Sequence, residues 1–467
     1  MLSASMKSLD LGLDTTKPSE SPSSGNINPD FELQVVVDSE NGKRLDAPEI
    51  ALYNGDTINL FSVKSLAKSD HLTANSVDWS YTTDTATTLV VASDKKSAVL
   101  NVTGVGSLTV NISCEGKTKT YSVIINVRPN LIANSVKTTS NAAFSYTDLD
   151  VDWSRELAFT ASRKSNICSD VVKFSNNTPT VIRSIGSASL QVCLGVKLFD
   201  NNSKVILSSN TSTKVAAWDV SSDMANSSLW YSMGEYSTGA AAKRISQIIP
   251  ISATSWEMIA TRRFGIYKTS IDLTGATNAY TASISLLSSY TEGSEFNSSA
   301  VLGDKILAQS FTGATEPIRK IDSSFTLEST INMTFFNWTS ISNATNTKAF
   351  LGGSGAMGAL LSYSSGQVIL EQQFRLANTS CLAIRSADIV VQQNKELLYS
   401  LCSEGRIDVY DITNISSPVF IKQGQLTGFE GEAYAIKIKP NSDTGIVVTN
   451  RGDFIMLNLR GLTTPSL

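Results

Sequence analysis

Short apolar runs separated by polar turns predict that this chain is built from β-strands. Between Asp388 and Gly424 there are four such runs, and the last two, RIDVYD and VFIK, are separated by the turn TNISSP. The first two lie in DIVVQQNKELLYSL and meet at Gln393-Asn394. Runs of this length, rich in Val, Ile and Tyr and bounded by Asn, Ser and Pro, are typical of strands and tight turns. Four short strands and three turns make one blade of a β-propeller.

The end of the third strand in this blade recurs along the chain. Strands that end in a small polar residue before a polar turn predict seven blades over residues 131–467, because their spacings of 42 to 53 residues suit four-stranded blades. The last blade has only three strands of its own. We therefore expect residues 131–138 to supply its fourth strand and close the ring. The recurring ends are Ser175, Asp219, Asp272, Asp322, Ser364, Asp411 and Asn458.

Residues 31–129 show a different pattern, with eight short runs that alternate and are bounded by turn signals. The strongest hairpin turns are Asn54-Gly55-Asp56 and Glu115-Gly116-Lys117. This spacing predicts an Ig-like β-sandwich. Residues 1–30 precede it, and their Pro- and Ser-rich part predicts a disordered linker, because it holds too little apolar surface to fold. The predicted fold is thus all-β, with an N-terminal Ig-like β-sandwich followed by a seven-bladed β-propeller.

Two segments of the predicted propeller resemble known repeat families. Arg406 to Gly424 (RIDVYDITNISSPVFIKQG) resembles a blade of the bacterial LVIVD-repeat propellers, and Val447 to Leu457 (VVTNRGDFIML) is similar to the YVTN propellers of microbial surface proteins. The resemblance implies a propeller over residues 131–467. It says far less about function, because propellers of one fold serve many functions.

The predicted sandwich resembles the bacterial Ig-like group 2 domain. The matching segments are Asn54-Gly55-Asp56-Thr57, Val77-Asp78-Trp79-Ser80 and Gly106-Ser107-Leu108-Thr109-Val110. In such domains the tryptophan packs between the sheets, which implies a structural role for Trp79. The resemblance also implies that this domain is a spacer or adhesion module.

Composition narrows the possible partners. The chain has 467 residues, of which 41% are hydrophobic and 17% charged, and its net charge is −4. No nucleic-acid partner is expected, because phosphate binding needs a clustered basic surface. No transmembrane segment is expected, because no apolar run is long enough to span a bilayer.

The abundance of Ser, Thr and Asn is common on secreted bacterial surface proteins. We therefore expect an exported protein at the cell surface, associated with the outer membrane or in the periplasm. The linker would suit a lipoprotein with a lipid anchor upstream of the chain.

Four of the five cysteines fall where the predicted blades bring them together. Cys168 and Cys193 are 25 residues apart, and Cys381 and Cys402 are 21 apart. Both pairs lie in loops on one face of the ring, so we predict disulfides Cys168–Cys193 and Cys381–Cys402, and hence an oxidising compartment. The alternative is that these are buried thiols.

Catalysis has little support in the sequence. The chain has one histidine, which excludes histidine-rich metal sites and places a Ser-His-Asp triad out of reach of the propeller. It also lacks a Gly-rich phosphate loop and a CxxC element. We assign no catalytic residue, no metal site and no cofactor, although paired carboxylates of the glycosidase type remain open.

The starts of the first strands should gather at the mouth of the central channel. Aromatic, Arg and carboxylate side chains at one rim suit recognition of a sugar or peptide by stacking and oriented hydrogen bonds. For any single residue, a role in satisfying its neighbours is the simpler interpretation. The predicted ligand-binding residues are Tyr146, Asp148, Arg244, Glu295, Trp338, Arg385, Glu430 and Glu432, within a wider set that adds Gln191, Gln247, Phe296 and Tyr434.

These patterns predict a non-enzymatic binding or adhesion protein whose propeller head recognises a glycan or a protein partner at its rim. A first alternative is a hydrolase or lyase acting on polysaccharide through carboxylates near Asp148, Glu295 and Glu432. A second alternative is a structural scaffold within an envelope complex.

Overall fold

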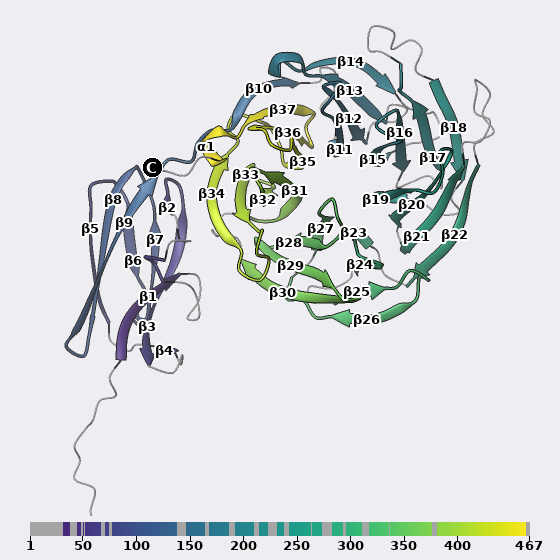
Figure 1. The fold of residues 1–467 in the computed structure, drawn as a ribbon. Coiled ribbons are helices and arrows are strands. Elements are labelled where there is room, and N and C mark those ends of the chain that lie inside the picture. The colour runs from purple at the N-terminus through teal and green to yellow at the C-terminus, as the bar shows by residue number, and fades with distance from the viewer. Residues whose placement is uncertain are drawn as a thin grey trace, which may run out of the picture.

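The computed structural model describes residues 31–37, 44–47, 50, 52–66, 71–73, 77–137, 146–163, 168–185, 192–209, 214–222, 231–237, 242–262, 264–272, 283–292, 296–310, 317–335, 337–375 and 381–463. The linker predicted for residues 1–30 lies outside this set, as do Gln191 and Glu295. Almost every described element is a strand, and the chain forms a small N-terminal domain beside a ring of sheets (Figure 1).

The N-terminal domain consists of two sheets that face each other. One has the order β1-β3-β7-β6, with β4 paired to β3, and the other has the order β2-β9-β8-β5. All pairings are antiparallel except that of β2 with β9. The strands are β1 (Phe31–Val37), β2 (Leu52–Tyr53), β3 (Thr57–Leu66), β4 (His71–Thr73), β5 (Asp78–Thr83), β6 (Thr88–Val91), β7 (Ser97–Asn101), β8 (Gly106–Cys114) and β9 (Lys117–Asn126).

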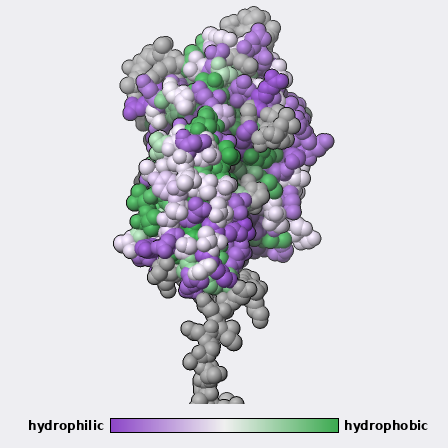
Figure 2. Space-filling view, turned by 90° about the vertical axis from the view of Figure 1, so that its left-hand side faces the viewer, coloured by the Kyte–Doolittle hydropathy of each residue, from purple (hydrophilic) through white to green (hydrophobic). Residues whose placement is uncertain are grey.

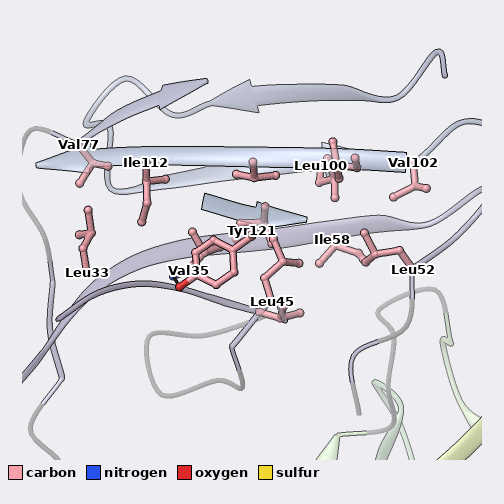
Figure 3. Close-up of a cluster of buried hydrophobic side chains, with 14 of the residues drawn as sticks. Leu33, Val35, Leu45, Leu52, Ile58, Val77, Leu100, Val102, Ile112 and Tyr121 are labelled. Carbon is pink, nitrogen blue, oxygen red and sulfur yellow. Dashed lines mark hydrogen bonds between the residues drawn. The ribbon is translucent and has the colours of Figure 1, made fainter. Parts of the chain in front are cut away.

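The core of this domain is formed by strands in which buried and exposed residues alternate. In β8 every second residue from Leu108 to Cys114 is buried, because successive side chains of a strand point to opposite faces. The buried side chains from the two sheets meet in one cluster (Figure 3). The buried Tyr121 hydroxyl accepts a hydrogen bond from the Val35 amide at 3.0 Å. Trp79 packs against this cluster but stays partly exposed, and its Nε1 donates to the Lys95 carbonyl at 2.9 Å.

The described part of residues 131–463 forms seven four-stranded antiparallel sheets arranged around a common centre (Figure 1). The first three sheets follow one another along the chain. The first contains β11 (Tyr146–Asp152), β12 (Leu157–Ser162), β13 (Ser169–Lys173) and β14 (Thr180–Ile185), with a 3₁₀ turn at Ser175–Asn177; the second contains β15 (Cys193–Phe199), β16 (Lys204–Ser209), β17 (Lys214–Asp219) and β18 (Tyr231–Ser237); the third contains β19 (Ala242–Pro250), β20 (Ser255–Arg262), β21 (Gly265–Asp272) and β22 (Ser283–Thr291).

The next three sheets repeat this order from the centre outward. The fourth contains β23 (Phe296–Leu302), β24 (Lys305–Ser310), β25 (Ile318–Ile321) and β26 (Leu327–Ile331); the fifth contains β27 (Asn337–Ser342), β28 (Lys348–Gly353), β29 (Met357–Ser364) and β30 (Gln367–Arg375); the sixth contains β31 (Ile384–Gln392), β32 (Lys395–Cys402), β33 (Arg406–Asp411) and β34 (Val419–Gln425).

The seventh sheet joins both ends of the ring segment. It contains β35 (Ala433–Ile438), β36 (Thr444–Thr449) and β37 (Asp453–Asn458), and its outermost strand is β10 (Ile132–Lys137). β10 pairs antiparallel with β37, so that Lys137 lies opposite Asp453. A short helix, α1 (Arg460–Thr463), follows, and its Leu462 is buried in the adjacent core.

Each sheet of the ring packs between two others, which explains why its middle strands are buried on both faces. All six residues of β12 (LAFTAS) are buried, because both faces of this strand are covered. The cores therefore lie between neighbouring sheets: Phe159 of the first sheet shares one with Val196 of the second. Among the described residues, no helix has the length and apolar character of a membrane span.

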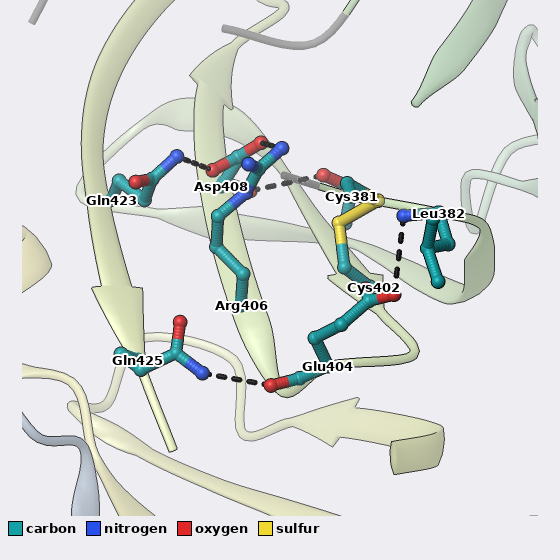
Figure 4. The surroundings of a disulfide bond; sticks show 9 residues. Cys381, Leu382, Cys402, Glu404, Arg406, Asp408, Gln423 and Gln425 are labelled. Carbon is teal, nitrogen blue, oxygen red and sulfur yellow. Dashed lines mark hydrogen bonds and ion pairs between the residues drawn. A yellow bond between two sulfur atoms is a disulfide. The ribbon is translucent and has the colours of Figure 1, made fainter. Parts of the chain in front are cut away.

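A buried polar network joins the N-terminal domain to the sixth sheet. Arg128 forms an ion pair with Asp56 of the N-terminal domain, and its Nε donates to Gln423 Oε1 at 2.6 Å. Gln423 Nε2 in turn donates to Asp408 Oδ1 at 2.5 Å, and Arg406 Nη2 lies 3.2 Å from Asp408 Oδ2 (Figure 4). We call these five residues the junction network. They hold the two domains together through contacts on strands β33 and β34.

Burial shapes the electrostatics of the junction network. Burial, together with the nearby positive charge of Arg406, lowers the pKa of Arg128 to about 10. Burial raises the pKa of Asp408, although Arg406 and the hydrogen bond from Gln423 counteract that rise. On the side that carries the N-terminal domain, hydrophobic residues form small patches among polar ones (Figure 2).

Candidate functional site: the mouth of the central channel

The first strands of the seven sheets surround a central channel. Its cavity has a volume of ≈ 320 Å³ and is lined by consecutive residues of β11, β15, β19, β23, β27, β31 and β35. Just over half of the lining side chains are polar or charged, among them Asp148, Arg244, Ser298, Ser340 and Lys437. The channel is therefore a polar cavity.

A β-bulge recurs near the start of each of these first strands. In the fifth, sixth and seventh sheets the pairing register shifts between Asn337 and Thr339, between Ile384 and Ser386, and between Ala433 and Ala435. The other four first strands have a register shift at the equivalent place. The extra residue of a bulge is not paired in the backbone hydrogen-bond ladder, and its side chain points in a changed direction. In the fifth to seventh sheets these extra residues are Trp338, Arg385 and Tyr434.

The three bulge residues stack on one another. The Arg385 guanidinium carbon lies 4.5 Å from the centroid of the Trp338 ring and 5.6 Å from that of Tyr434. Arg385 Nη2 also lies 2.8 Å from Glu432 Oε2, and both atoms form a charge-assisted hydrogen bond. We call Trp338, Arg385, Glu432 and Tyr434 the mouth cluster. It joins three sheets at the end of the channel where the first strands begin.

The two charged members of the mouth cluster differ in exposure. The Arg385 side chain is 17% exposed and the Glu432 side chain 43%. Arg385 Nε is buried, and none of the described residues accepts a hydrogen bond from it. The Glu432 amide donates to Asn450 Oδ1 at 2.9 Å, which fixes the backbone at this point. The mouth cluster therefore has a fixed backbone, a positioned guanidinium and a carboxylate that reaches solvent.

Deeper in the channel, four charges alternate around neighbouring first strands. Asp388, Lys437, Asp150 and Lys197 occupy equivalent places in β31, β35, β11 and β15, each two residues after the start of regular pairing. We call them the charge belt. Lys197 Nζ lies 3.6 Å from Asp150 Oδ2. Burial opposes the charge of Lys437, but Asp388, Asp150 and Asp148 raise its pKa overall.

The channel carboxylates also link neighbouring strands. Asp148 Oδ2 and Asp150 Oδ2 accept hydrogen bonds from the amides of Val196 and Leu198 in the next sheet, at 3.2 and 2.9 Å. Asp388 Oδ2 does the same for the Ile438 amide at 2.8 Å. Adjacent first strands share no backbone ladder, so these side chains satisfy the amides that face the channel. The aspartates of the charge belt are thus explained by the need to pair these backbone amides.

The opposite side of the channel uses hydroxyls for the same purpose. Ser298 Oγ donates to Ser340 Oγ at 3.1 Å, and Ser246 and Ser299 form another hydroxyl pair between the third and fourth sheets. Ser342 donates to the Val301 carbonyl. The channel therefore has one half with alternating charges and one half lined mainly by hydroxyls, where Arg244 is the charged residue of the lining.

The predicted ligand-binding residues separate into three groups. Trp338, Arg385 and Glu432 come together in the mouth cluster, whereas Asp148 and Arg244 line the channel. Burial raises the pKa of Asp148, although Arg244 and the amides of Val196 and Leu149 counteract that rise.

The remaining three are Tyr146, Glu430 and Glu295. Tyr146 is fully buried, and its hydroxyl donates to Asp170 Oδ2 at 2.8 Å, so it lies inside the first sheet and does not reach the rim. Glu430 is exposed on the loop before β35, where its amide donates to Asp453 Oδ2 at 3.2 Å. Glu295 lies outside the described residues.

Sequence reasoning missed Lys197, Asp388 and Lys437. These residues stand at one equivalent position of successive first strands, as the pairing registers show. Aligning the first strands with each other would have placed opposite charges in neighbouring sheets. That alignment needed the position of the bulge, which the apolar pattern does not mark.

Both predicted disulfides are confirmed. Cys168–Cys193 connects the first sheet to the start of the second, with Cα atoms 5.2 Å apart. Cys381–Cys402 fixes the start of β31 to the end of β32, with Cα atoms 5.6 Å apart (Figure 4). Both lie on the face where the first strands begin. The second therefore braces the strand that carries Arg385.

Comparison with known proteins shows the fold of the ring. No protein-family model matches the chain, and no curated protein matches it either. The β-propeller domain of Cps50 (Swd1) from Myceliophteria thermophila superposes with a TM-score of 0.50 at 11% identity, covering 71% of this chain and 99% of that one. Hydrazine synthase from Kuenenia stuttgartiensis gives a TM-score of 0.51 at 8% identity, covering 69% and 97%. At these identities the likeness concerns the fold alone, and it confirms that the chain contains a β-propeller.

Proposed function

We propose that this chain is an exported, non-enzymatic binding protein of the cell surface or periplasm. Its head is a seven-bladed propeller of the LVIVD type, and the mouth cluster on that head recognises a glycan or a protein partner. Its N-terminal domain is an Ig-like spacer of the bacterial group 2 kind, held rigidly to the head by the junction network.

Two observations support the finer assignments of fold. The described part of residues 131–463 contains seven four-stranded sheets, and β10 pairs with β37 so that the two ends of the segment share one sheet. The N-terminal domain has two facing sheets around one core, with a tryptophan packed against it. Both features suit the families that the sequence resembles.

The observation that carries the function is the stacking of Trp338, Arg385 and Tyr434 beside Glu432. Bulges in three neighbouring strands aim these side chains at one place. Aromatic rings with a positioned guanidinium and carboxylate recognise ligands by stacking and oriented hydrogen bonds. Such a cluster at the mouth of a polar channel supports a binding site.

The channel geometry favours binding over hydrolysis. A general acid or base needs a carboxylate that is available to the substrate. Asp148 Oδ1 and Oδ2 accept hydrogen bonds from the amides of Leu149 and Val196, and Glu432 is paired with Arg385. Asp148 is therefore engaged by the protein itself, so it does not serve as the second carboxylate of an acid–base pair beside Glu432.

Export is supported by the two disulfides. Disulfides of this kind persist in oxidising compartments such as the periplasm and the cell surface. A protein-binding head on a spacer suits the same location.

The test is a glycan array and a pull-down from envelope extracts, both with the whole chain. Arg385→Ala and Trp338→Ala should each lower the signal of the recognised partner by about tenfold or more, because the cluster loses its guanidinium or its ring. Glu328→Gln, on the outermost strand of the fourth sheet, is the control and should leave binding unchanged. Binding that persists at full strength in both mouth variants would refute the proposed site.

A further inference from the structure

We propose that the mouth cluster selects uncharged sugars with neighbouring hydroxyl groups, an inference that rests on the proposed function. The cluster offers a hydrogen-bond donor and an acceptor side by side, with two aromatic rings around them. It also carries no surplus charge.

The donor and acceptor come from one ion pair. Arg385 and Glu432 are joined through Nη2 and Oε2, and Arg385 Nε is buried, so the other Nη hydrogens of Arg385 and Glu432 Oε1 are left for a ligand. Guanidinium N–H groups only donate, and a carboxylate only accepts. A hydroxyl group does both. Two adjacent hydroxyls of a sugar ring can therefore satisfy the pair at once, one by accepting from Arg385 and the other by donating to Glu432.

The rings of the cluster supply the apolar contact. Trp338 and Tyr434 are both partly exposed, and both rings lie near the guanidinium. A pyranose has a face of C–H groups that packs on an aromatic ring while its hydroxyls point outward. The combination of ring and polar pair matches the amphipathic shape of a sugar.

The charges near the mouth disfavour ionised ligands. An acidic ligand bound to the free N–H groups of Arg385 would meet the carboxylate of Glu432, and a basic ligand bound to Glu432 would meet the guanidinium of Arg385, because the two groups lie 2.8 Å apart. Below the mouth, the charge belt alternates Asp388, Lys437, Asp150 and Lys197, so neither sign dominates the channel. The remaining polar lining consists mainly of serine and threonine hydroxyls.

The experiment uses the whole chain on an array of neutral oligosaccharides, ending in hexose, deoxyhexose or N-acetylhexosamine, and of matched uronate-bearing oligosaccharides. Titration calorimetry then measures the best neutral and the best uronate-bearing probe at low and at high salt. The variants are Glu432→Gln, Arg385→Lys and Trp338→Ala, with Glu328→Gln as the matched control. Thermal unfolding of each variant establishes that it is folded.

We expect binding of neutral probes with little dependence on salt. Glu432→Gln and Arg385→Lys should each weaken it by about tenfold, because each disturbs one hydrogen bond to a charged group. Should Glu432→Gln fail to fold, Arg385→Lys and Trp338→Ala carry the test.

The direction in which Glu432→Gln changes the affinity separates the inference from the proposed function. The site takes anions if three results occur together: uronate-bearing probes bind, salt weakens their binding, and Glu432→Gln strengthens it. The inference is then wrong, while the proposed function stands. The same holds if only a protein partner binds and the mouth variants abolish its binding. If no mouth variant changes the binding of any probe or partner, both are wrong.

Discussion

Four charges of the channel illustrate how single residues close the ring. Asp388, Lys437, Asp150 and Lys197 alternate in sign over the sixth, seventh, first and second sheets, which span the point where the two ends of the ring segment meet. A buried ion is tolerated when its neighbours neutralise it and its lone pairs are hydrogen-bonded. Asp150 meets both conditions through Lys197 and the amides of Val151 and Leu198.

The stability that Asp150 contributes should depend on pH. Burial alone would raise its pKa, but Lys197, Lys437 and the backbone amides outweigh burial and lower it. A lowered folded pKa gives stability that is present above the unfolded value of about 3.9 and is lost as the pH falls through the folded pKa. Asp150→Asn should therefore lower the free energy of unfolding at neutral pH and converge with the parent in acid. Urea unfolding at neutral pH and at about pH 3 measures this difference.

The contrary outcome is simple to recognise. A difference between Asp150→Asn and the parent that stays constant from neutral pH into acid would mean that the carboxylate charge contributes nothing at this place. Asp148 and Asp388 affect the pH dependence of stability in the opposite direction, because burial raises the pKa of both. Both residues are present in the parent and in the variant, so their contribution cancels to first order when the two proteins are compared.

At the scale of the strand, sequence patterns revealed the third strands well. Asp219, Asp272, Ser364, Asp411 and Asn458 are the last residues of β17, β21, β29, β33 and β37. A polar residue there ends an apolar run, which is a local signal. The bulges were invisible, because strands buried on both faces do not alternate strictly and an extra residue leaves no mark. That is why the sequence suggested Trp338, Arg385 and Glu432 as members of a rim without showing that they touch.

The disulfide of the sixth sheet should stabilise the strand that carries Arg385. Replacing both Cys381 and Cys402 by Ala should lower the free energy of unfolding by about 2–4 kcal/mol, because the unfolded chain gains the freedom of an open loop. Chemical unfolding of the double variant and of the parent, each without reductant, measures this loss. Equal stability of the two proteins would show that the bridge is dispensable for folding.

At the scale of the whole molecule, the junction network makes one unit of two domains. Arg128 is central to it, because this residue bridges Asp56 of the N-terminal domain and Gln423 of the sixth sheet. The Tyr53 hydroxyl adds a contact by accepting from the Gln423 amide at 3.3 Å. Sequence reasoning could propose two domains and a short joint between them. It could not find this contact, because its partners lie 295 residues apart and no local pattern relates them.

Removal of the Arg128 side chain should uncouple the domains. Arg128→Ala leaves Asp56 buried without its cation and removes a positive charge that lies near Asp408. We therefore expect the free energy of unfolding to fall by about 3–5 kcal/mol and unfolding to occur in two separate transitions. Calorimetry detects the transitions, and small-angle scattering detects a wider range of shapes. Arg44→Ala breaks an exposed pair with Asp46 and should cost less than about 1 kcal/mol. A single unaltered transition in Arg128→Ala would contradict this role.

The backbone hydrogen bonds made where the chain enters the ring also determine which strand a pulling force on the N-terminal domain reaches first. Before β10 begins, the Pro129 carbonyl accepts from the Gln425 amide and the Leu131 amide donates to the Gln425 carbonyl, both at 3.0 Å. A pull on the N-terminal domain is therefore transmitted to β34 through these clamps and the Arg128 side chain. The pairing of β10 with β37 follows these clamps along the chain, so a force applied through the N-terminal domain reaches the clamps before it reaches the pair of strands that closes the ring.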